Sequence, residues 1–247
     1  MNGLHPSDDP MPSSQASYDT LRNVTPEHAC PYLPGLLSRN EVYWTDHLDG
    51  SLYERLLARG FRRSGRVVYR PRCRGCRECR QTRVIVDRFQ PTHSMRRVQR
   101  RNADVVVEVG EPRPTPQRFD LYLRYLGFQH DDTMERTFES FREFLGDSPT
   151  KTLEFRYLLG DHLIGVSIAD ECPKGLSSVY MYFDPDFADR SLGTFSVLWE
   201  VEYCRRRGLP YYYLGFYVAG SGKMRYKARF RPSEVLVAED RWISLPQ

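Results

Sequence analysis

The sequence predicts a mixed α+β protein, in which a cysteine-containing β/α lobe precedes a larger mixed-sheet domain. Three observations support this class. Apolar and polar residues alternate in three runs between residues 152 and 183, separated by Gly160-Asp161 and Pro173-Lys174-Gly175, which is typical of an antiparallel meander. A helical pattern over residues 193–207 and a short apolar strand at 211–214 follow. Upstream, short strand and helix patterns surround a loop with three cysteines.

Length and composition set the domain organisation that we expect. The chain has 247 residues, 40% of them hydrophobic, which permits real cores. Residues 1–27 lack a periodic apolar pattern and predict a flexible tail. Pro112, Pro114 and Pro116 mark a boundary between a Cys/Arg-rich lobe at 28–111 and a domain at 112–247. The absence of an apolar run of ~18 residues and of a signal-peptide core predicts a cytoplasmic protein without membrane contact.

The elements of the first lobe each have a local cause. Apolar residues recur at four-residue spacing between the capping sequence 49–51 and Gly60, which predicts a short helix. Ser94 is expected to cap a basic helix that runs to Asn102. Strands are predicted at residues 41–44, 66–70, 82–86 and 105–109.

The second part opens with two amphipathic patterns. Their apolar residues are Phe119, Tyr122, Leu123 and Leu126, then Met134, Phe138, Phe141 and Leu145. Such stripes could stack a cofactor or a base, but at this spacing a buried helix face is expected. A late strand is predicted at 235–237. This order of strands, then strand, turn and helix, then further strands, is typical of an acyl-CoA N-acyltransferase-like (GNAT-like) domain.

Residues 60–101 carry a segregated positive charge. They contain 14 arginines, no lysine and only two acids, a formal charge of +12 in a chain whose total is +4. Arginine forks match phosphate and carboxylate groups, so binding of such anions is expected in preference to a merely solvated face. Arg88, Arg96, Arg97, Arg100 and Arg101 suit a phosphate track on RNA, whereas those near the cysteine loop could hold one carboxylate.

The cysteine loop predicts a metal or cluster site. Cys73, Cys76 and Cys79 are separated by two-residue gaps, and Cys30 is the obvious fourth ligand. Zn would take four such ligands in a tetrahedron, and an iron–sulfur cluster is also compatible. The alternative is a set of free thiols whose pKa values are lowered by neighbouring arginines.

Cations alternate with aromatic residues near the C-terminus, in residues 211–232. The turn Gly220-Ser221-Gly222-Lys223 is not a P-loop, because the first glycine of that motif is missing and Met224 replaces its Ser or Thr. Residues 190–193 resemble a phosphate-binding turn weakly. No Ser/His/Asp order, HExxH motif or acid pair stands out, so hydrolysis finds little support.

Several motifs together resemble one known family. They are Cys30-Pro31-Tyr32, Tyr69-Arg70-Pro71 with Cys73 and Cys76, Arg83-Val84, Ser94 with Arg96-Arg97 and Asn102, Tyr182 with Asp184-Pro185, Ser191-Leu192-Gly193, Lys223-Met224 with Tyr226-Lys227, and Pro232. Over residues 28–240 the chain resembles the arginyl-tRNA-protein transferases, in particular their short bacterial branch, the aspartate/glutamate leucyltransferases. The resemblance implies transfer of leucine from leucyl-tRNA to the α-amine of proteins that begin with Asp or Glu, which marks them for degradation. It also implies an iron–sulfur cluster or metal at the four cysteines, with no cofactor for catalysis.

On this resemblance we assign roles to residues. Asp184 is the predicted base or amine-orienting group, with Tyr182 nearby, and Lys227 or Tyr226 contacts the oxyanion or the tRNA 3′ end. The alternative for Asp184 is a turn acid before Pro185. The predicted substrate- and tRNA-binding residues are Arg66, Arg72, Arg83, Arg96, Arg97, Arg100, Lys223 and Arg225.

Three alternatives remain open from the sequence. The donor could be arginyl-tRNA. The same fold could serve an acetyl-CoA-dependent N-acyltransferase, which residues 190–193 would support. Residues 60–101 alone would suit a metal-containing RNA-binding protein without catalysis.

Overall fold

The computed structural model describes residues 23–129 and 134–245. Most of the predicted tail, residues 1–22, lies outside this description. Its last residues belong to the fold: β1 (Asn23–Val24) pairs with β4 (Asn40–Trp44), and the amide of Thr25 donates to the carbonyl of Asn40 at 2.9 Å. The predicted end of the tail at residue 27 is therefore too late.

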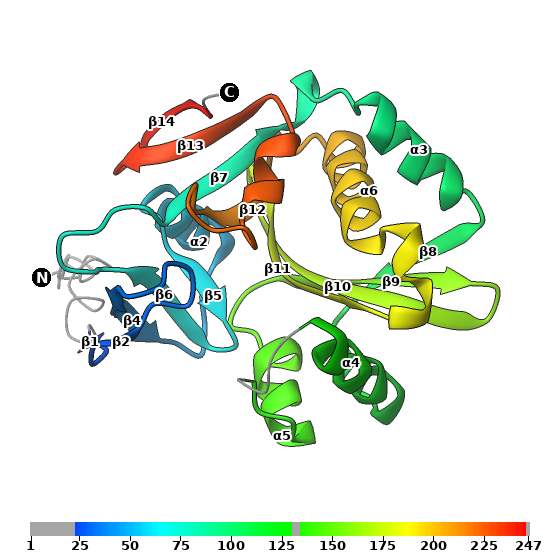
Figure 1. Cartoon of the computed structure of the whole chain (residues 1–247), viewed down its shortest axis with the longest axis horizontal. Coiled ribbons are helices and arrows are strands. Elements are labelled where there is room, and N and C mark those ends of the chain that lie inside the picture. Colours follow the sequence, from blue (N-terminus) through cyan, green and yellow to red (C-terminus); the bar gives the residue numbers. More distant parts are fainter. Residues whose placement is uncertain (1–22, 130–133, 246–247) are drawn as a thin grey trace, which may run out of the picture.

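The described chain forms a small lobe and a large sheet with helices on both faces (Figure 1). The helices are α2 (Gly50–Ala58), α3 (His93–Arg101), α4 (Pro116–Gln129), α5 (Phe138–Phe141) and α6 (Leu192–Arg207), with short turns η1 (Val86–Arg88), η2 (Arg142–Gly146), η3 (Pro185–Arg190) and η4 (Arg225–Arg229). The small lobe has the strand order β1, β4, β6 (Val67–Pro71), β5 (Arg62–Ser64), and a separate pair of β2 (His28–Ala29) with β3 (Leu37–Ser38). The large sheet has the order β14 (Arg241–Ser244), β13 (Ser233–Ala238), β7 (Arg80–Ile85), β12 (Tyr211–Tyr217), β11 (Gly175–Phe183), β10 (His162–Cys172), β9 (Thr152–Leu159), β8 (Val105–Gly110).

The predicted α+β class and the meander are confirmed. Strands β9, β10 and β11 pair antiparallel in sequence order, and β12 returns parallel to β11 after the crossover helix α6. Helices α3 and α6 cover one face of the sheet, and α4 and α5 cover the other (Figure 1). The predicted aromatic stripe of α4 and α5 is a buried face, because Tyr122, Leu126 and Phe141 pack in one core cluster with Tyr182.

The large sheet extends across the predicted boundary near residue 111. Strand β7, which precedes that boundary, lies between β12 and β13, and β8 pairs with β9. Alternation along a strand indicates which face is buried but not which strand is its neighbour, so the sequence could not show this exchange. The cysteine loop therefore connects the small lobe directly to the centre of the large sheet.

Helix ends follow the capping chemistry, with one correction. Asp49 caps α2 as expected, accepting from the amides of Ser51 and Leu52. The cap of α3 is Thr92, whose hydroxyl accepts from the amide of Met95 at 3.3 Å, and not Ser94, which lies inside the helix. Both hydroxyls fit a cap chemically, and the chain direction after Pro91 selects the earlier one.

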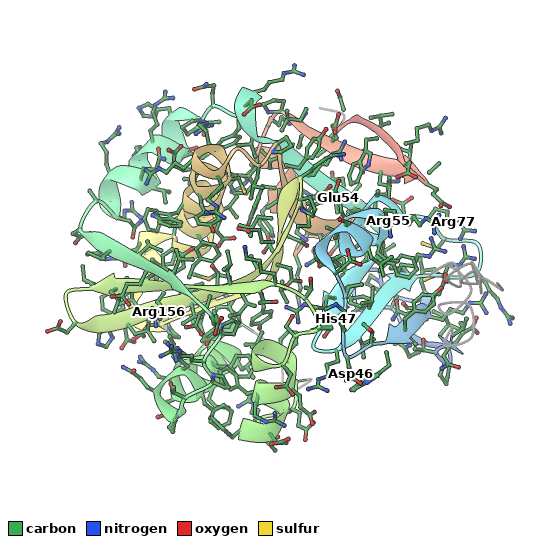
Figure 2. The ribbon with its side chains drawn as sticks, turned by 180° about the vertical axis from the view of Figure 1, so that it is seen from behind. Asp46, His47, Glu54, Arg55, Arg77 and Arg156 are labelled. Atoms are coloured by element: carbon green, nitrogen blue, oxygen red, sulfur yellow. The ribbon has the colours of Figure 1, made fainter. Side chains whose placement is uncertain are left out.

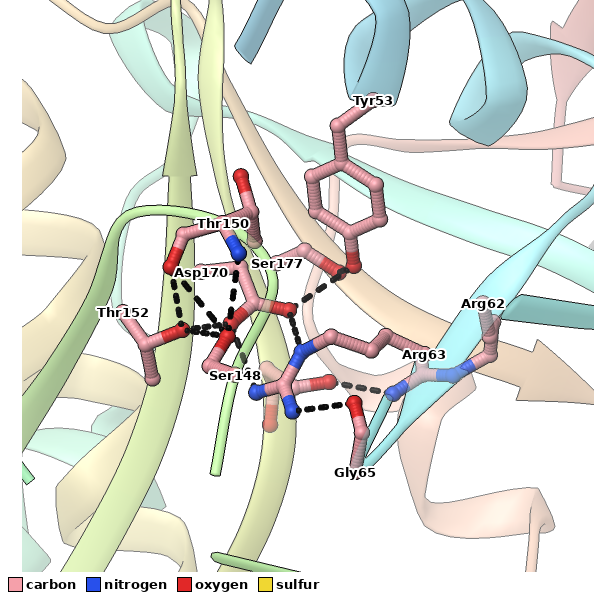
Figure 3. A network of polar contacts seen from close by, with 10 residues as sticks. Tyr53, Arg62, Arg63, Gly65, Ser148, Thr150, Thr152, Asp170 and Ser177 are labelled. Carbon is pink, nitrogen blue, oxygen red and sulfur yellow. Dashed lines mark hydrogen bonds and ion pairs between the residues drawn. The ribbon is translucent and has the colours of Figure 1, made fainter. Parts of the chain in front are cut away.

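A buried ion pair fastens the small lobe to the large sheet (Figure 3). Arg63 of β5 donates to both carboxylate oxygens of Asp170 on β10, at 2.8 and 2.7 Å, and both side chains are fully buried. The hydroxyls of Tyr53 and Thr152 donate to the same carboxylate at 3.0 and 2.6 Å. Four donors compensate the buried charge, so β5 is held rigidly against the sheet.

Candidate functional site

The candidate site is built where two parallel strands separate. Strands β11 and β12 pair only from Gly175 to Ser177 and from Tyr211 to Tyr213, although β11 continues to Phe183 and β12 to Tyr217. Beyond the last pair, the carbonyl of Ser178 accepts from Arg62 Nη2, and the carbonyl of Phe216 accepts from Lys227 Nζ at 2.7 Å. We call this opening, bounded by Ser178 and Phe216, the β11/β12 fork. The side chains of Arg62 and Lys227 thus donate to backbone carbonyls that lie beyond the last pair of β11 and β12.

Arg62 reaches the fork from the small lobe because a glycine admits it. Gly215 has φ +83, and a Cβ atom there would lie 1.8 Å from Arg62 Nη1. Glycine is required both for the left-handed backbone and for the close approach of the guanidinium. Figure 3 shows Arg62 and its neighbour Arg63 directed at different partners from the same strand.

Lys227 is a buried amine with an altered proton affinity. Lys227 belongs to η4 and is 7% exposed, and its side-chain amine donates to the carbonyl of Phe216. Burial, and then the charge of Arg62, lower the pKa of Lys227 to about 7, against an opposing effect of Cys79. With this pKa, roughly half of the Lys227 side chains are neutral at pH 7 and can accept a proton.

Tyr226 lies within electrostatic range of Arg62 and of the buried carboxylate of Glu200. Tyr226 is 42% exposed, and burial around its hydroxyl raises the pKa of that group. The next influences on that pKa are the charges of Arg62 and Glu200. Burial raises the pKa of Glu200 to about 7, and Ser167, Tyr157 and Tyr212 donate to its carboxylate.

The other two predicted catalytic residues lie in different surroundings. Asp184 accepts from Arg124 Nη1 at 2.8 Å, from His162 at 3.3 Å and from the amide of Asp186. Burial opposes these contacts, but together they lower the pKa of Asp184 below its ordinary value. Tyr182 is 1% exposed in the core beneath α4. Within the described residues, no hydrogen bond or ion pair joins either of them to Tyr226 or Lys227. The geometry therefore favours a structural role for Asp184, which caps η3 and pairs with Arg124.

Some of the predicted substrate-binding cations are paired with carboxylates of the protein, and others are exposed at its surface. Arg83 is engaged: it pairs with Glu234 at 2.8 Å and lies over the rings of Tyr211 and Trp242. Arg72 shares the buried carboxylate of Glu41 with Arg70.

Other predicted cations lie at the surface. Arg96, Arg97 and Arg100 are exposed on α3, as are Lys223 and Arg225 beside the fork. For Arg97 and Arg100 no ion pair is found in residues 23–129 and 134–245. Arg66 pairs with Asp46 at 2.7 Å and lines a cavity of about 480 Å³ between the small lobe and η2. In the view from behind, charged side chains such as Arg77 and Arg156 spread over the surface of both parts (Figure 2).

The four cysteines are neighbours without forming a converged metal site. The pKa of Cys79 is raised to about 12, chiefly by burial and then by Cys30, Cys73 and Cys76, so all three lie within electrostatic range of it. Nevertheless, among the described residues no three His, Cys, Asp or Glu side chains are arranged to hold a metal ion. The predicted lowering of the thiol pKa values is not found for Cys79, because burial, the neighbouring cysteines and Glu78 all raise its pKa.

The turn at residues 190–193 does not offer a free cation. Arg190 donates to both carboxylate oxygens of Asp104, at 2.8 and 3.1 Å, and to the carbonyl of Arg101. Ser191 precedes α6 with φ +57 and makes no side-chain cap. Arg190, at the turn that would support a coenzyme A site, therefore binds the segment between α3 and β8 instead.

Arg62 and Glu200 are the site residues that the sequence did not single out. Arg62 was one of 14 arginines and carried no distinguishing spacing. Its position depends on β5, a three-residue strand that the sequence pattern did not reveal. The glycine inside the apolar run Tyr211-Tyr212-Tyr213-Leu214-Gly215 was the available signal of a close backbone approach.

Comparison with known proteins identifies the family. The N-terminal model of the arginine-tRNA-protein transferases matches residues 28–97, and their C-terminal model matches residues 117–237. The chain is 36% identical to the aspartate/glutamate leucyltransferase of Hahella chejuensis, over 90% of this chain and 96% of that protein. It is 42% identical to the enzyme of that name from Stenotrophomonas maltophilia (strain K279a), over 85% of this chain and 87% of that one.

A crystal structure of FemX aligns with 85% of this chain and 84% of its own, at TM-score 0.43 and 8% identity. Within the described residues, no helix is long and apolar enough to cross a membrane. The two leucyltransferases match almost end to end at more than a third identity, which decides the family. The chain therefore belongs to the arginine-tRNA-protein transferase family and, within it, to the aspartate/glutamate leucyltransferases.

Proposed function

We propose that the protein transfers leucine from leucyl-tRNA to the α-amine of proteins whose first residue is Asp or Glu. The observation that carries this proposal is the 36% identity to a protein of that name along 90% of the chain. The fork adds physical support, because it places a proton acceptor and cations at one point of the sheet. We place the protein in the cytoplasm, where both substrates occur.

The transfer requires modest chemistry. The α-amine of the acceptor, with an ordinary pKa of ~7.7–8, attacks the carbonyl carbon of the leucyl ester. A C–N bond forms, the bond to the ribose oxygen breaks, and the proton lost by the amine returns to that oxygen. Alignment of the two substrates can contribute roughly 7–11 kcal/mol at best.

We assign the proton transfer to Lys227 and donation to the oxyanion to Tyr226. The Nζ of neutral Lys227 can donate to Phe216 and still offer its lone pair to the α-ammonium group. The hydroxyl of Tyr226, the residue before Lys227, is the donor in this assignment. Asp184, the base or amine-orienting group predicted from the sequence, instead holds Arg124 and caps the start of η3 in this proposal.

Exposed cations supply the tRNA contact in this proposal. Arg96, Arg97 and Arg100 of α3 form the backbone-binding set, together with Lys223 and Arg225 at the fork. Arg66 and Arg72 remain candidates at the edge of the small lobe. Arg83 is not included in the proposed tRNA contact, because its guanidinium lies over the rings of Tyr211 and Trp242 and pairs with Glu234.

We further propose that Cys30, Cys73, Cys76 and Cys79 hold one Zn ion or iron–sulfur cluster. The donor set is soft and all-thiol, which suits either group, and the three other cysteines lie within electrostatic range of Cys79. Such a group would supply thiolate bonds that fix the loop before β7. Transfer itself takes place at the fork and uses none of them.

A donor and acceptor matrix tests the function. Purified protein is supplied with leucyl-tRNA or arginyl-tRNA and with peptides that begin with Asp, Glu or Ala. We expect transfer of leucine to the Asp and Glu peptides only. Failure to transfer either amino acid would overturn the proposal, and transfer of arginine alone would replace the donor.

A further inference from the structure

Three arginine side chains are buried in the described part of the chain, and they differ in their partners. Arg63 and Arg118 are 3% and 7% exposed, and each pairs with a buried carboxylate: Arg63 with Asp170, and Arg118 with Glu154 at 2.9 Å. Arg62 is 8% exposed and forms no ion pair with any described residue. Its Nη1 is buried and has no hydrogen-bond partner. A buried cation without a counter-ion is costly, so an anion from outside the chain is expected there.

Among the described residues, no carboxylate forms a hydrogen bond or ion pair with Arg62. Its charge acts on Lys227, Tyr226, Tyr32 and Tyr53, none of which is a carboxylate. Burial, Arg62 and Cys79 account for the altered pKa of Lys227, and no carboxylate contributes. The fork therefore holds two adjacent basic groups with one unused donor between the strands.

We propose that Arg62 binds the side-chain carboxylate of the acceptor's first residue through Nη1 and so determines the preference for acidic N-termini. This assignment rests on the proposed function. A carboxylate on a short side chain can enter between two strands, whereas a tRNA phosphate belongs to a continuous backbone. Phosphates have the exposed arginines of α3 available to them.

The position also links binding to reaction. The α-amine of an Asp or Glu residue lies only a few bonds from its side-chain carboxylate. A carboxylate held at Arg62 therefore brings the amine towards Lys227, because Arg62 and Lys227 occupy carbonyls on the two facing strands. An Asn or Gln side chain would leave the guanidinium unneutralised, which disfavours binding.

The test compares acceptors that differ only in charge. Peptides that begin with Asp, Glu, Asn or Gln are otherwise identical, and leucyl-tRNA is saturating. We expect Arg62→Met to lower kcat/KM for the Asp and Glu peptides by at least about 30-fold more than for the Asn and Gln peptides, because loss of the Arg62 charge also raises the pKa of Lys227 and slows all four equally. Arg62→Lys should keep part of the acidic preference. Arg59→Met, which removes an exposed arginine paired with Glu239, is the matched control and should change none of the four.

An equal loss for all four peptides would overturn the assignment, because it would mean an oxyanion-binding or purely structural role. Binding provides a check that needs neither catalysis nor a variant. The dipeptide Asp-Ala should raise the Tm of the wild-type protein more than Asn-Ala at equal concentration, and equal shifts would also overturn the assignment. If the wild-type protein transfers leucine to no acceptor, the proposed function fails, and the dipeptide measurement still decides the role of Arg62.

Discussion

Replacement of Lys227 is the sharpest test of the proposed chemistry. A lysine with the ordinary pKa of 10.5 is deprotonated in roughly one molecule in 3,000 at pH 7, whereas Lys227, at about 7, is deprotonated in roughly half. Since general-base catalysis contributes about 10²–10⁴-fold, we expect Lys227→Met to lower kcat by a factor in that range. Lys227→Arg should be as slow, because a guanidinium keeps the charge and the donor but cannot accept a proton.

The pH dependence gives an independent measurement of the same residue. In the wild-type protein kcat should rise through pH 7 as Lys227 loses its proton, and this rise should vanish in both variants. Lys174→Met, which removes an exposed lysine paired with Glu54, serves as the control and should leave the profile unchanged. An Lys227→Arg variant with near-normal kcat would refute the base role and leave Lys227 as a positive contact only.

The free energy of unfolding should also depend on pH through the protonation of Lys227. The folded-state pKa of Lys227 lies below the unfolded value of 10.5, so the unfolded chain binds more protons between pH 7 and 10.5. The free energy of unfolding should therefore rise with pH across that window through this group, and the rise should be smaller in Lys227→Met. Urea titrations at several pH values measure it, and an unchanged slope would contradict the lowered pKa.

Further predictions concern the lobe junction, the cysteines and tRNA. Arg63→Met should cost about 3–5 kcal/mol of unfolding free energy in urea titrations, because Asp170 is left charged and buried, whereas the exposed Arg59→Met should cost about 0–1; equal costs would contradict the argument. Elemental analysis of anaerobically prepared protein should find about one Zn, or one iron–sulfur cluster, per chain, and Cys79→Ser should lose it; wild-type protein without either would reject the ligand set. Arg97→Ala should weaken tRNA binding and reduce its salt slope by about 1, and an unchanged slope would remove Arg97 from the tRNA contact.

The sequence predicted the larger part of the fold. The β9–β10–β11 meander, helix α6 and its end at Gly208 follow from local alternation, helical spacing and a left-handed glycine, all of which act within a few residues. The same local signals explain the small error at α3, where Thr92 and Ser94 compete for one cap. Strand partners are a property of the whole chain, so the insertion of β7 beside β12 was not visible.

The family and the identity of Tyr226 and Lys227 as candidate residues were also available from the sequence, since they depend on motifs along the chain. Only the tertiary structure decided what these residues do. It paired Asp184 with Arg124, and it showed that Arg63 has a carboxylate partner while its neighbour Arg62 has none. Burial and long-range charge set these roles, and both arise only when β5 of the small lobe reaches the point where β11 and β12 separate.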